Sequence, residues 1–166
     1  SESAVAYLRR ALAEPPNPDE RAELLLELGS AETEVDGDAA IEHLQEAHEL
    51  SATPIERARV ALLLGRQLFL LRGDEADAVF IEALDELSGA DAELERLLGA
   101  GLIMNDLFSP SLHGSALERL ERVRRRPVAE TIGEKLLLSL LAYNDARAGA
   151  PADEVVPLVR QFLETV

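Results

Sequence analysis

One feature constrains the fold of this chain more than any other: the sequence repeats itself at a spacing of 36 residues. Shifting the chain by 36 residues places Asn17 on Thr53, and in both copies a proline follows at once and a glutamate stands three residues after the Asn or Thr. Helices begin in this way, with a capping side chain, a proline in the first turn and a glutamate that completes a capping box. The same shift superposes further residues, namely Leu28 on Leu64, Gly29 on Gly65, Gly37 on Gly73 and Asp38 on Asp74. Each repeat is therefore expected to hold two helices, with Gly37 and Gly73 ending a first helix and Asp38 and Asp74 capping a second one.

The second half of each repeat carries a pattern of small, large and small residues at spacings of four and three, which places them on one helix face. The copies are Ala4, Leu8 and Ala11; Ala40, Leu44 and Ala47; Ala76, Phe80 and Ala83; and, in looser register, Ala116, Leu120 and Val123, then Val155, Val159 and Phe162. We expect the small residues, together with Gly29 and Gly65, to let helices approach closely. Leu44 and Phe80 are expected to fill the grooves between neighbouring hairpins. Because a hairpin alone cannot bury such a face, the hairpins are expected to stack.

Composition agrees with helices. Apolar residues make up 47% of the chain but aromatic residues only 4%, and the apolar share is mostly Ala and Leu, which are strong helix formers. The pattern predicts nine helices, over residues 2–14, 18–36, 39–50, 54–72, 75–88, 91–107, 115–125, 130–148 and 153–165. The fold class is therefore predicted as all-α: a single repeat domain over residues 1–166, with about four hairpins after a leading helix.

The two ends of the sequence indicate a segment of a longer multidomain protein. Met104 is the only methionine, so no initiator methionine is present, and the first predicted helix matches the second half of a hairpin. Residues 1–4 lack the charged and apolar regions of a signal peptide. No apolar run approaches the roughly 18 residues that a membrane span needs. A cytoplasmic location is expected.

The charge of the chain limits its partners. There are 32 acidic and 16 basic residues, which gives a formal net charge of −16. Such a surface repels phosphate backbones and anionic lipids, so direct binding of nucleic acid or of a membrane is not expected. Solubility alone also explains acidity of this kind.

The sequence shows no pattern of catalytic or cofactor-binding residues. Cysteine is absent, which excludes disulfides, thiolate metal sites and cysteine nucleophiles. The single lysine, Lys135, is not part of a P-loop, and Gly99 and Gly101 lie inside a helical pattern, where a close-packing or helix-loosening role is expected. His43 and His48 are five residues apart and diverge on a helix, and the many carboxylates follow solvent-face spacings. We therefore expect no enzyme activity, no cofactor and no metal site.

Basic residues are scarce, and five of them gather in one predicted helix. They are Arg119, Arg122, Arg124, Arg125 and Arg126. Positive charge is favoured at the C-terminus of a helix, and Glu118 and Glu121 offset it. The alternative is a docking patch for an acidic partner or another domain.

The Leu-Gly pairs, the small–large–small pattern and the repeat lengths of 36, 34 and about 40 residues resemble tetratricopeptide repeats. The usual aromatic positions are mostly lost and the hairpin turns are about one residue short, so the resemblance is to tetratricopeptide-like repeats. It implies helical hairpins stacked as a right-handed α-solenoid.

A narrower resemblance covers residues 4 to about 88. Residues 6–16 (AYLRRALAEPP), 25–32 (LLELGSAE) and 40–47 (AIEHLQEA) are similar to the helical-repeat region of large ATP-binding regulators of the LuxR family. Those regulators are multidomain transcription factors of high-GC bacteria, with an ATPase module before the helical repeats and a helix-turn-helix after them. Neither the ATPase motifs nor the DNA-binding helices occur in this chain. The resemblance implies a regulatory module that senses an effector or partner and couples the ATPase and DNA-binding modules.

In related repeat folds the first helix of each hairpin lines the concave surface. Carried over from the Leu-Gly positions, this surface gives the predicted binding residues Arg59, Arg66, Phe69, Arg96, Met104, Tyr143 and Arg147. The same face also includes Glu23, Ser30, Thr33 and Glu34 on the first hairpin, Leu70 on the second, and Glu93 and Ile103 on the third. Its arginines suit an anionic group or an acidic peptide, and ion pairs within the face are the alternative.

The leading hypothesis is a non-catalytic interaction module of a LuxR-type transcriptional regulator. Its partner would be a protein, a peptide, another domain of the parent chain or a small-molecule effector. The alternative is a free-standing tetratricopeptide-like adaptor that binds a peptide or protein.

Overall fold

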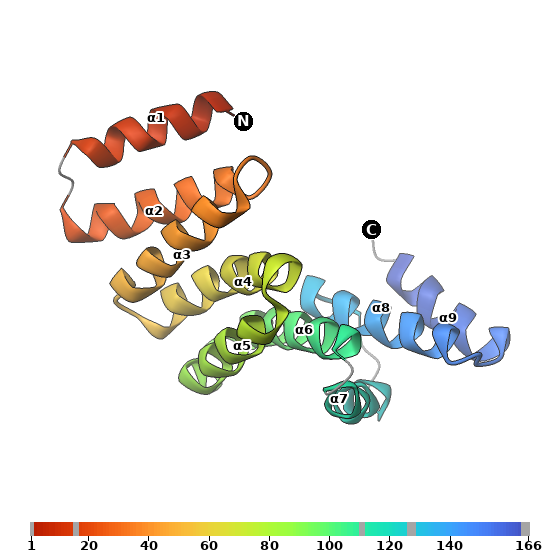
Figure 1. Ribbon diagram of the computed structural model, residues 1–166. Coiled ribbons are helices and arrows are strands. Elements are labelled where there is room, and N and C mark those ends of the chain that lie inside the picture. Colours follow the sequence, from red (N-terminus) through yellow and green to blue (C-terminus); the bar gives the residue numbers. More distant parts are fainter. Residues whose placement is uncertain (1, 15–16, 110–111, 126–128, 164–166) are drawn as a thin grey trace. The chain divides into compact units, whose positions relative to one another are not determined.

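The chain is all-α over the residues that the structure describes. The computed structural model describes residues 2–14, 17–109, 112–125 and 129–163, and the regular structure in these ranges is helical (Figure 1). The helices are α1 (Glu2–Ala13), α2 (Pro18–Glu32), α3 (Gly37–Leu50), α4 (Pro54–Leu71), α5 (Gly73–Leu87), α6 (Ala92–Phe108), α7 (His113–Arg125), α8 (Ile132–Arg147) and α9 (Ala152–Leu163). Every predicted helix has a counterpart here, although the predicted end at residue 165 lies outside the described residues.

The predicted helix starts at Asn17 and Thr53 are confirmed. The side chain of Asn17 accepts a hydrogen bond from the backbone N–H of Glu20, at 2.9 Å. Thr53 and Glu56 form a complete capping box, in which each side chain accepts from the backbone of the other residue. These bonds satisfy backbone donors that the first turn of a helix leaves without partners.

The predicted turn between α2 and α3 is wrong in detail. The first helix ends at Glu32 rather than at residue 36, and Gly37 is the first residue of α3 instead of the end of α2. Asp36, not Asp38, is the cap, because its carboxylate accepts from the N–H of Ala39 three residues on. In the next repeat Gly73 likewise begins α5, where Arg72 holds the cap position without a side-chain hydrogen bond.

The chain divides into two compact units, unit 1 (Ser1–Ala90) and unit 2 (Asp91–Val166). In unit 1, α2 pairs with α3 and α4 with α5, while α3 also packs against α4 and α1 against α2 (Figure 1). In unit 2, α6 packs against both α7 and α8, and α9 packs against α8. The prediction of one continuous repeat domain over residues 1–166 stays a prediction.

Two glycines set how closely the helices of unit 1 approach. A Cβ atom placed on Gly29 would lie 2.7 Å from Cγ of Leu44, and one on Gly65 would lie 2.6 Å from Cε1 of Phe80. In each pair the two residues are 15 positions apart, and the second pair lies 36 positions after the first. The 36-residue repeat of the sequence therefore also appears in the contacts between helices. Leu44 and Phe80 each pack beside the glycine of their own hairpin. Their expected role in filling the grooves between neighbouring hairpins stays a prediction.

In unit 2 the close approach occurs at a different glycine. Nothing lies within 4 Å of a Cβ placed on Gly99, so close packing does not explain this residue. A Cβ on Gly133 would instead lie 2.6 Å from Cβ of Arg96, where α8 meets α6. The core of this unit is a cluster of apolar residues from α6, α7 and α8 and the segment before α8, including Ile103, Leu107, Ala116, Leu120, Ala129, Leu138 and Leu141.

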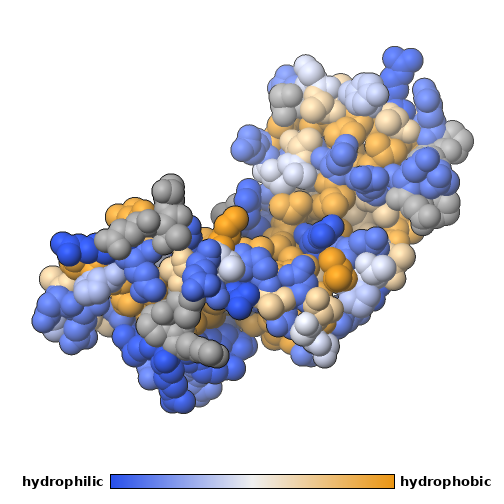
Figure 2. Space-filling model, turned by 180° about the vertical axis from the view of Figure 1, so that it is seen from behind, coloured by the Kyte–Doolittle hydropathy of each residue, from blue (hydrophilic) through white to orange (hydrophobic). Residues whose placement is uncertain are grey.

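The face of the molecule in Figure 2 mixes hydrophobic and hydrophilic residues. Among the described residues no helix is both long and apolar enough to cross a membrane. The charge is uneven: unit 1 holds 20 acidic and 7 basic residues, a balance of −13, and unit 2 holds 12 and 9, a balance of −3.

Candidate functional site

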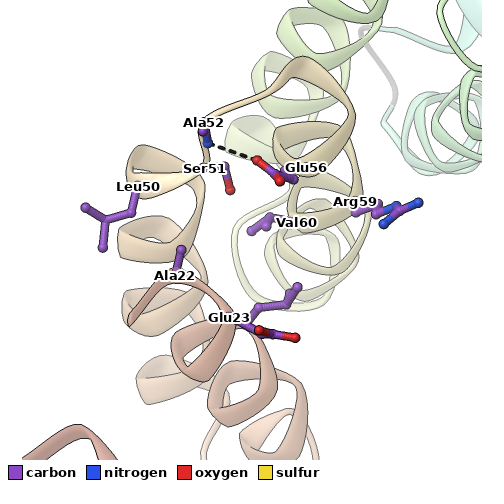
Figure 3. Close-up of a pocket in the computed structure, with 9 residues that line it drawn as sticks. Ala22, Glu23, Leu50, Ser51, Ala52, Glu56, Arg59 and Val60 are labelled. Atoms are coloured by element: carbon purple, nitrogen blue, oxygen red, sulfur yellow. Dashed lines mark hydrogen bonds between the residues drawn. The ribbon is translucent and has the colours of Figure 1, made fainter. Parts of the chain in front are cut away.

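A groove opens in unit 1 between α2, the end of α3 and the start of α4. Its volume is about 540 Å³. The lining residues are Ala22, Glu23, Leu26, Leu50, Ser51, Ala52, Glu56, Arg59 and Val60. In Figure 3, Val60 points from α4 toward α2 and α3, whereas Arg59 extends outward from α4. The groove therefore has an apolar floor and a charged edge.

The turn between α3 and α4 gives the groove a fixed wall. Ser51 is buried and donates through its hydroxyl to the carbonyl of Ala47, at 2.8 Å. The carboxylate of Glu56 accepts from the backbone N–H of Ala52 at 3.0 Å (Figure 3) and from that of Thr53 at 2.9 Å. The hydrogen bonds with Thr53 hold the pKa of Glu56 below its ordinary value, with a smaller contribution from the positive charge of Arg59.

Glu23 and Arg59 bring opposite charges to the edge of the groove. Both side chains are exposed, and within the described residues no ion pair joins them. The neighbouring Arg57 differs, because it binds Glu86 at 2.5 Å and donates to the carbonyl of Ser51 at 2.9 Å. Arg59 is thus the guanidinium at this edge that remains exposed for a ligand.

The structure places the other predicted residues of unit 1 along α4. Arg66 is exposed and lies two turns after Arg59 on the same face of the helix, and Phe69 is half-buried one turn further on. Thr33 and Glu34 lie beyond the end of α2, in the turn before α3. The structure therefore brings Arg59 and Glu23 together at the groove and sets Arg66 and Phe69 beyond it.

The predicted residues of unit 2 lie on α6 and α8. Arg96 is engaged in ion pairs, with its Nε 3.2 Å from Oε1 of Glu134 and its Nη1 3.7 Å from Oε2 of Glu93. Met104 is half-buried, and Tyr143 and Arg147 are exposed near the end of α8. Arg96 therefore lies near the amino end of α6, whereas Tyr143 and Arg147 lie near the carboxyl end of α8.

Two arginines of the predicted cluster on α7 pair with buried carboxylates. Arg124 binds the buried carboxylate of Asp145 through two hydrogen bonds of 2.9 and 2.6 Å, which raise the pKa of Arg124. Arg119 lies 3.4 Å from the buried Asp106. Arg122 and Arg125 are exposed, and Arg126 lies outside the described residues.

Sequence patterns did not indicate a buried polar cluster in unit 1. Glu32 is fully buried, and its carboxylate accepts from Arg9 of α1, at 3.0 and 2.6 Å, and lies 2.6 Å from Nδ1 of His43 on α3. Glutamates are almost never fully buried unless paired, and both partners are distant in sequence. No local signal could therefore have singled out Glu32. The cluster joins three helices and occupies no groove.

The described residues contain no group of three or more histidine, aspartate or glutamate side chains arranged to hold a metal ion. They define an all-helical protein with an open, mixed-charge groove on one unit. No protein-family model, curated protein or solved structure matches this chain.

Proposed function

We propose that this chain is a tetratricopeptide-like interaction module, stacked as a right-handed α-solenoid, that binds a peptide segment of a protein partner. The observation that carries the proposal is the groove beside Arg59. It lies between two helices that the 36-residue repeat makes equivalent, α2 and α4, and such first helices line the binding surface in related repeat folds.

The chemistry of the groove suits a peptide better than a reaction. Leu26 and Val60 offer apolar contact, while Glu23 and Arg59 offer one group of each charge at the edge. An extended peptide brings side chains of both kinds together, and a guanidinium binds a carboxylate through two parallel hydrogen bonds. Glu56 already accepts two backbone hydrogen bonds, so it serves the fold of the wall.

We further propose that the parent protein is a LuxR-type transcriptional regulator and that the partner is one of its other modules or an effector protein. The support is the similarity of residues 6–16, 25–32 and 40–47 to the helical-repeat region of such regulators. The complete coding sequence tests this part. A P-loop ATPase module upstream and a helix-turn-helix downstream would support the regulator, and a reading frame with neither would favour the free-standing adaptor.

A binding experiment tests the groove itself. The purified chain is titrated with the isolated ATPase module of the parent protein, and the affinity is measured by calorimetry. If the parent protein has no ATPase module, the protein encoded by the adjacent gene takes its place in the titration. Ala22→Phe should fill the groove and Arg59→Gln should remove the guanidinium, each weakening binding at least about tenfold, a loss of about 1.4 kcal/mol. Arg10→Gln, an equal charge change on the exposed side of α1, is the control. Equal affinity in all four proteins would reject the groove as the site.

A further inference from the structure

An exposed aromatic pair lies at the carboxyl ends of α6 and α8 in unit 2. The rings of Phe108 and Tyr143 stack with their centroids 6.3 Å apart and their planes 26° from parallel. Even so, 60% of Phe108 and 47% of Tyr143 remain exposed. Aromatic side chains usually bury most of their surface, and exposed apolar patches on folded proteins commonly mark binding sites.

The helices extend this pair into a surface. α6 and α8 run in the same direction, because Glu93 accepts from the N–H of Gly133 at their amino ends and Phe108 meets Tyr143 at their carboxyl ends. Leu136, which is 41% exposed, lies two turns before Tyr143 on the same face of α8. Leu136 therefore adds an exposed apolar side chain on the face of α8 that carries Tyr143.

A cationic group stands beside the rings. Arg147 follows Tyr143 by one turn on α8 and is exposed. Its Nη2 lies 3.4 Å from Nε2 of His113, whose Nδ1 lies 3.3 Å from the carbonyl oxygen of Leu107. Because a carbonyl only accepts, Nδ1 carries the hydrogen and Nε2 accepts from Arg147. The imidazole of His113 therefore lies beside the guanidinium and brings no negative charge to it.

Three acids of unit 2 are engaged by other arginines. Asp145 and Asp106 are buried against Arg124 and Arg119, and Glu134 pairs with Arg96 at the other end of α8. Within the described residues no carboxylate pairs with Arg147. The last turn of a helix favours a cation, but that preference does not account for two aromatic rings left exposed beside it.

From this juxtaposition we propose that Phe108, Tyr143 and Arg147 form a second docking surface, which binds a peptide of a protein partner through an apolar side chain followed by a carboxylate. The apolar side chain covers the rings, and the carboxylate binds the guanidinium of Arg147, which pairs with no acid among the described residues. The proposal concerns a different unit from the groove beside Arg59 and does not depend on the function proposed for that groove.

The chain is well suited to the test because it has no tryptophan and only two tyrosines. In a Tyr7→Phe background, Tyr143 is the only tyrosine, so its fluorescence and NMR signals report on this surface. The probes are acetyl-Leu-Phe-Asp-Glu-amide and its neutral counterpart acetyl-Leu-Phe-Asn-Gln-amide. We expect both to shift the Tyr143 signals, with the acidic probe binding at least about tenfold more tightly.

Two variants separate the apolar from the charged part of the surface. Arg147→Gln should make the two probes bind equally, and Phe108→Ala should weaken both. Arg160→Gln removes an exposed arginine of α9 in the same unit and should change neither. The proposal fails if the probes bind equally to the Tyr7→Phe chain, if Arg160→Gln acts like Arg147→Gln in that background, or if neither probe binds at millimolar concentration. It also fails if inorganic phosphate shifts the Tyr143 signals as the acidic probe does, because the surface would then be a simple anion site.

Discussion

At the scale of single residues, glycines inside helices differ in what surrounds them, although they look alike in the sequence. Gly65 and Gly99 both occupy helix interiors, where glycine is less favourable than alanine by about 1 kcal/mol. A Cβ on Gly65 would lie against the ring of Phe80, which is almost fully buried, whereas a Cβ on Gly99 would meet nothing within 4 Å. The same substitution is therefore expected to have opposite effects at the two positions.

Gly65→Ala should lower the free energy of unfolding by about 1–3 kcal/mol, because the methyl group overpacks the contact with Phe80. Gly99→Ala should raise it by about 0.5–1 kcal/mol through helix propensity alone. Urea unfolding followed by circular dichroism measures both. Adding Phe80→Leu to Gly65→Ala should recover part of the loss. Two alanine variants that shift stability in the same direction would contradict the packing argument.

The buried Glu32 gives a second residue-scale prediction. Arg9→Met leaves a fully buried carboxylate with His43 as its remaining partner among the described residues, so the free energy of unfolding should fall by about 2–3 kcal/mol. Arg21 is the matched control, because it pairs with Glu46 at 2.5 Å but both side chains are well exposed. Arg21→Met should cost less than about 1 kcal/mol. Equal losses in the two variants would show that burial of Glu32 contributes nothing.

At the scale of helices, the capping box of α4 predicts a dependence on pH. The pKa of Glu56 is held below its ordinary value of 4.5, so its carboxylate stabilises the folded chain above that value. This contribution is lost as the pH falls through the lowered pKa of the folded state. The stability difference between the unaltered chain and Glu56→Gln should thus be present at neutral pH and disappear in acid.

NMR titration of the Glu56 carboxyl group measures the same effect directly. The side chain of Thr53 and its backbone N–H both lower the pKa of Glu56. In Thr53→Ala the hydroxyl is lost while the backbone N–H remains, so this pKa should move partway toward its ordinary value. A titration curve unchanged by Thr53→Ala would show that the capping box does not set this pKa.

The helices themselves were predictable because their signals are local. The caps at Asn17 and Thr53 and the periodic faces of α3 and α5 stand within a few residues of one another. The turn at Asp36 was misjudged because two aspartates, one on each side of Gly37, both offered a capping oxygen. Only the hydrogen bond to Ala39 decides between them.

The candidate sites depended on information that no local pattern holds. Arg57, Arg59 and Arg66 share one helix, and only the position of α5 ties Arg57 to Glu86 and leaves Arg59 exposed at the groove. Tyr143 and Arg147 were expected on a binding face. Their neighbours Phe108 and His113 were not, since α6 and α7 contribute them from more than 30 residues away.

At the scale of the whole molecule, charge opposes folding. The net charge is −16, and unit 1 carries −13 of it over its first 90 residues. Repulsion between like charges destabilises a compact state, while the described ion pairs are mostly at the surface and contribute little each. Repulsion between like charges acts over longer distances than the attraction within an ion pair. Added salt should therefore weaken the repulsion more than it weakens the ion pairs.

Raising sodium chloride from about 10 to about 150 mM shortens the screening length from about 30 to about 8 Å. The thermal midpoint of the chain should therefore rise over this range. Replacing the exposed Glu27, Glu42 and Glu82 with glutamine should reduce the rise, because these residues add to the repulsion. Replacing the exposed Arg10, Arg59 and Arg66 with glutamine changes the same number of charges in the same unit and should increase it. If the midpoint instead falls with salt, and both triple variants behave alike, short-range ion pairs stabilise this protein more than its net charge destabilises it.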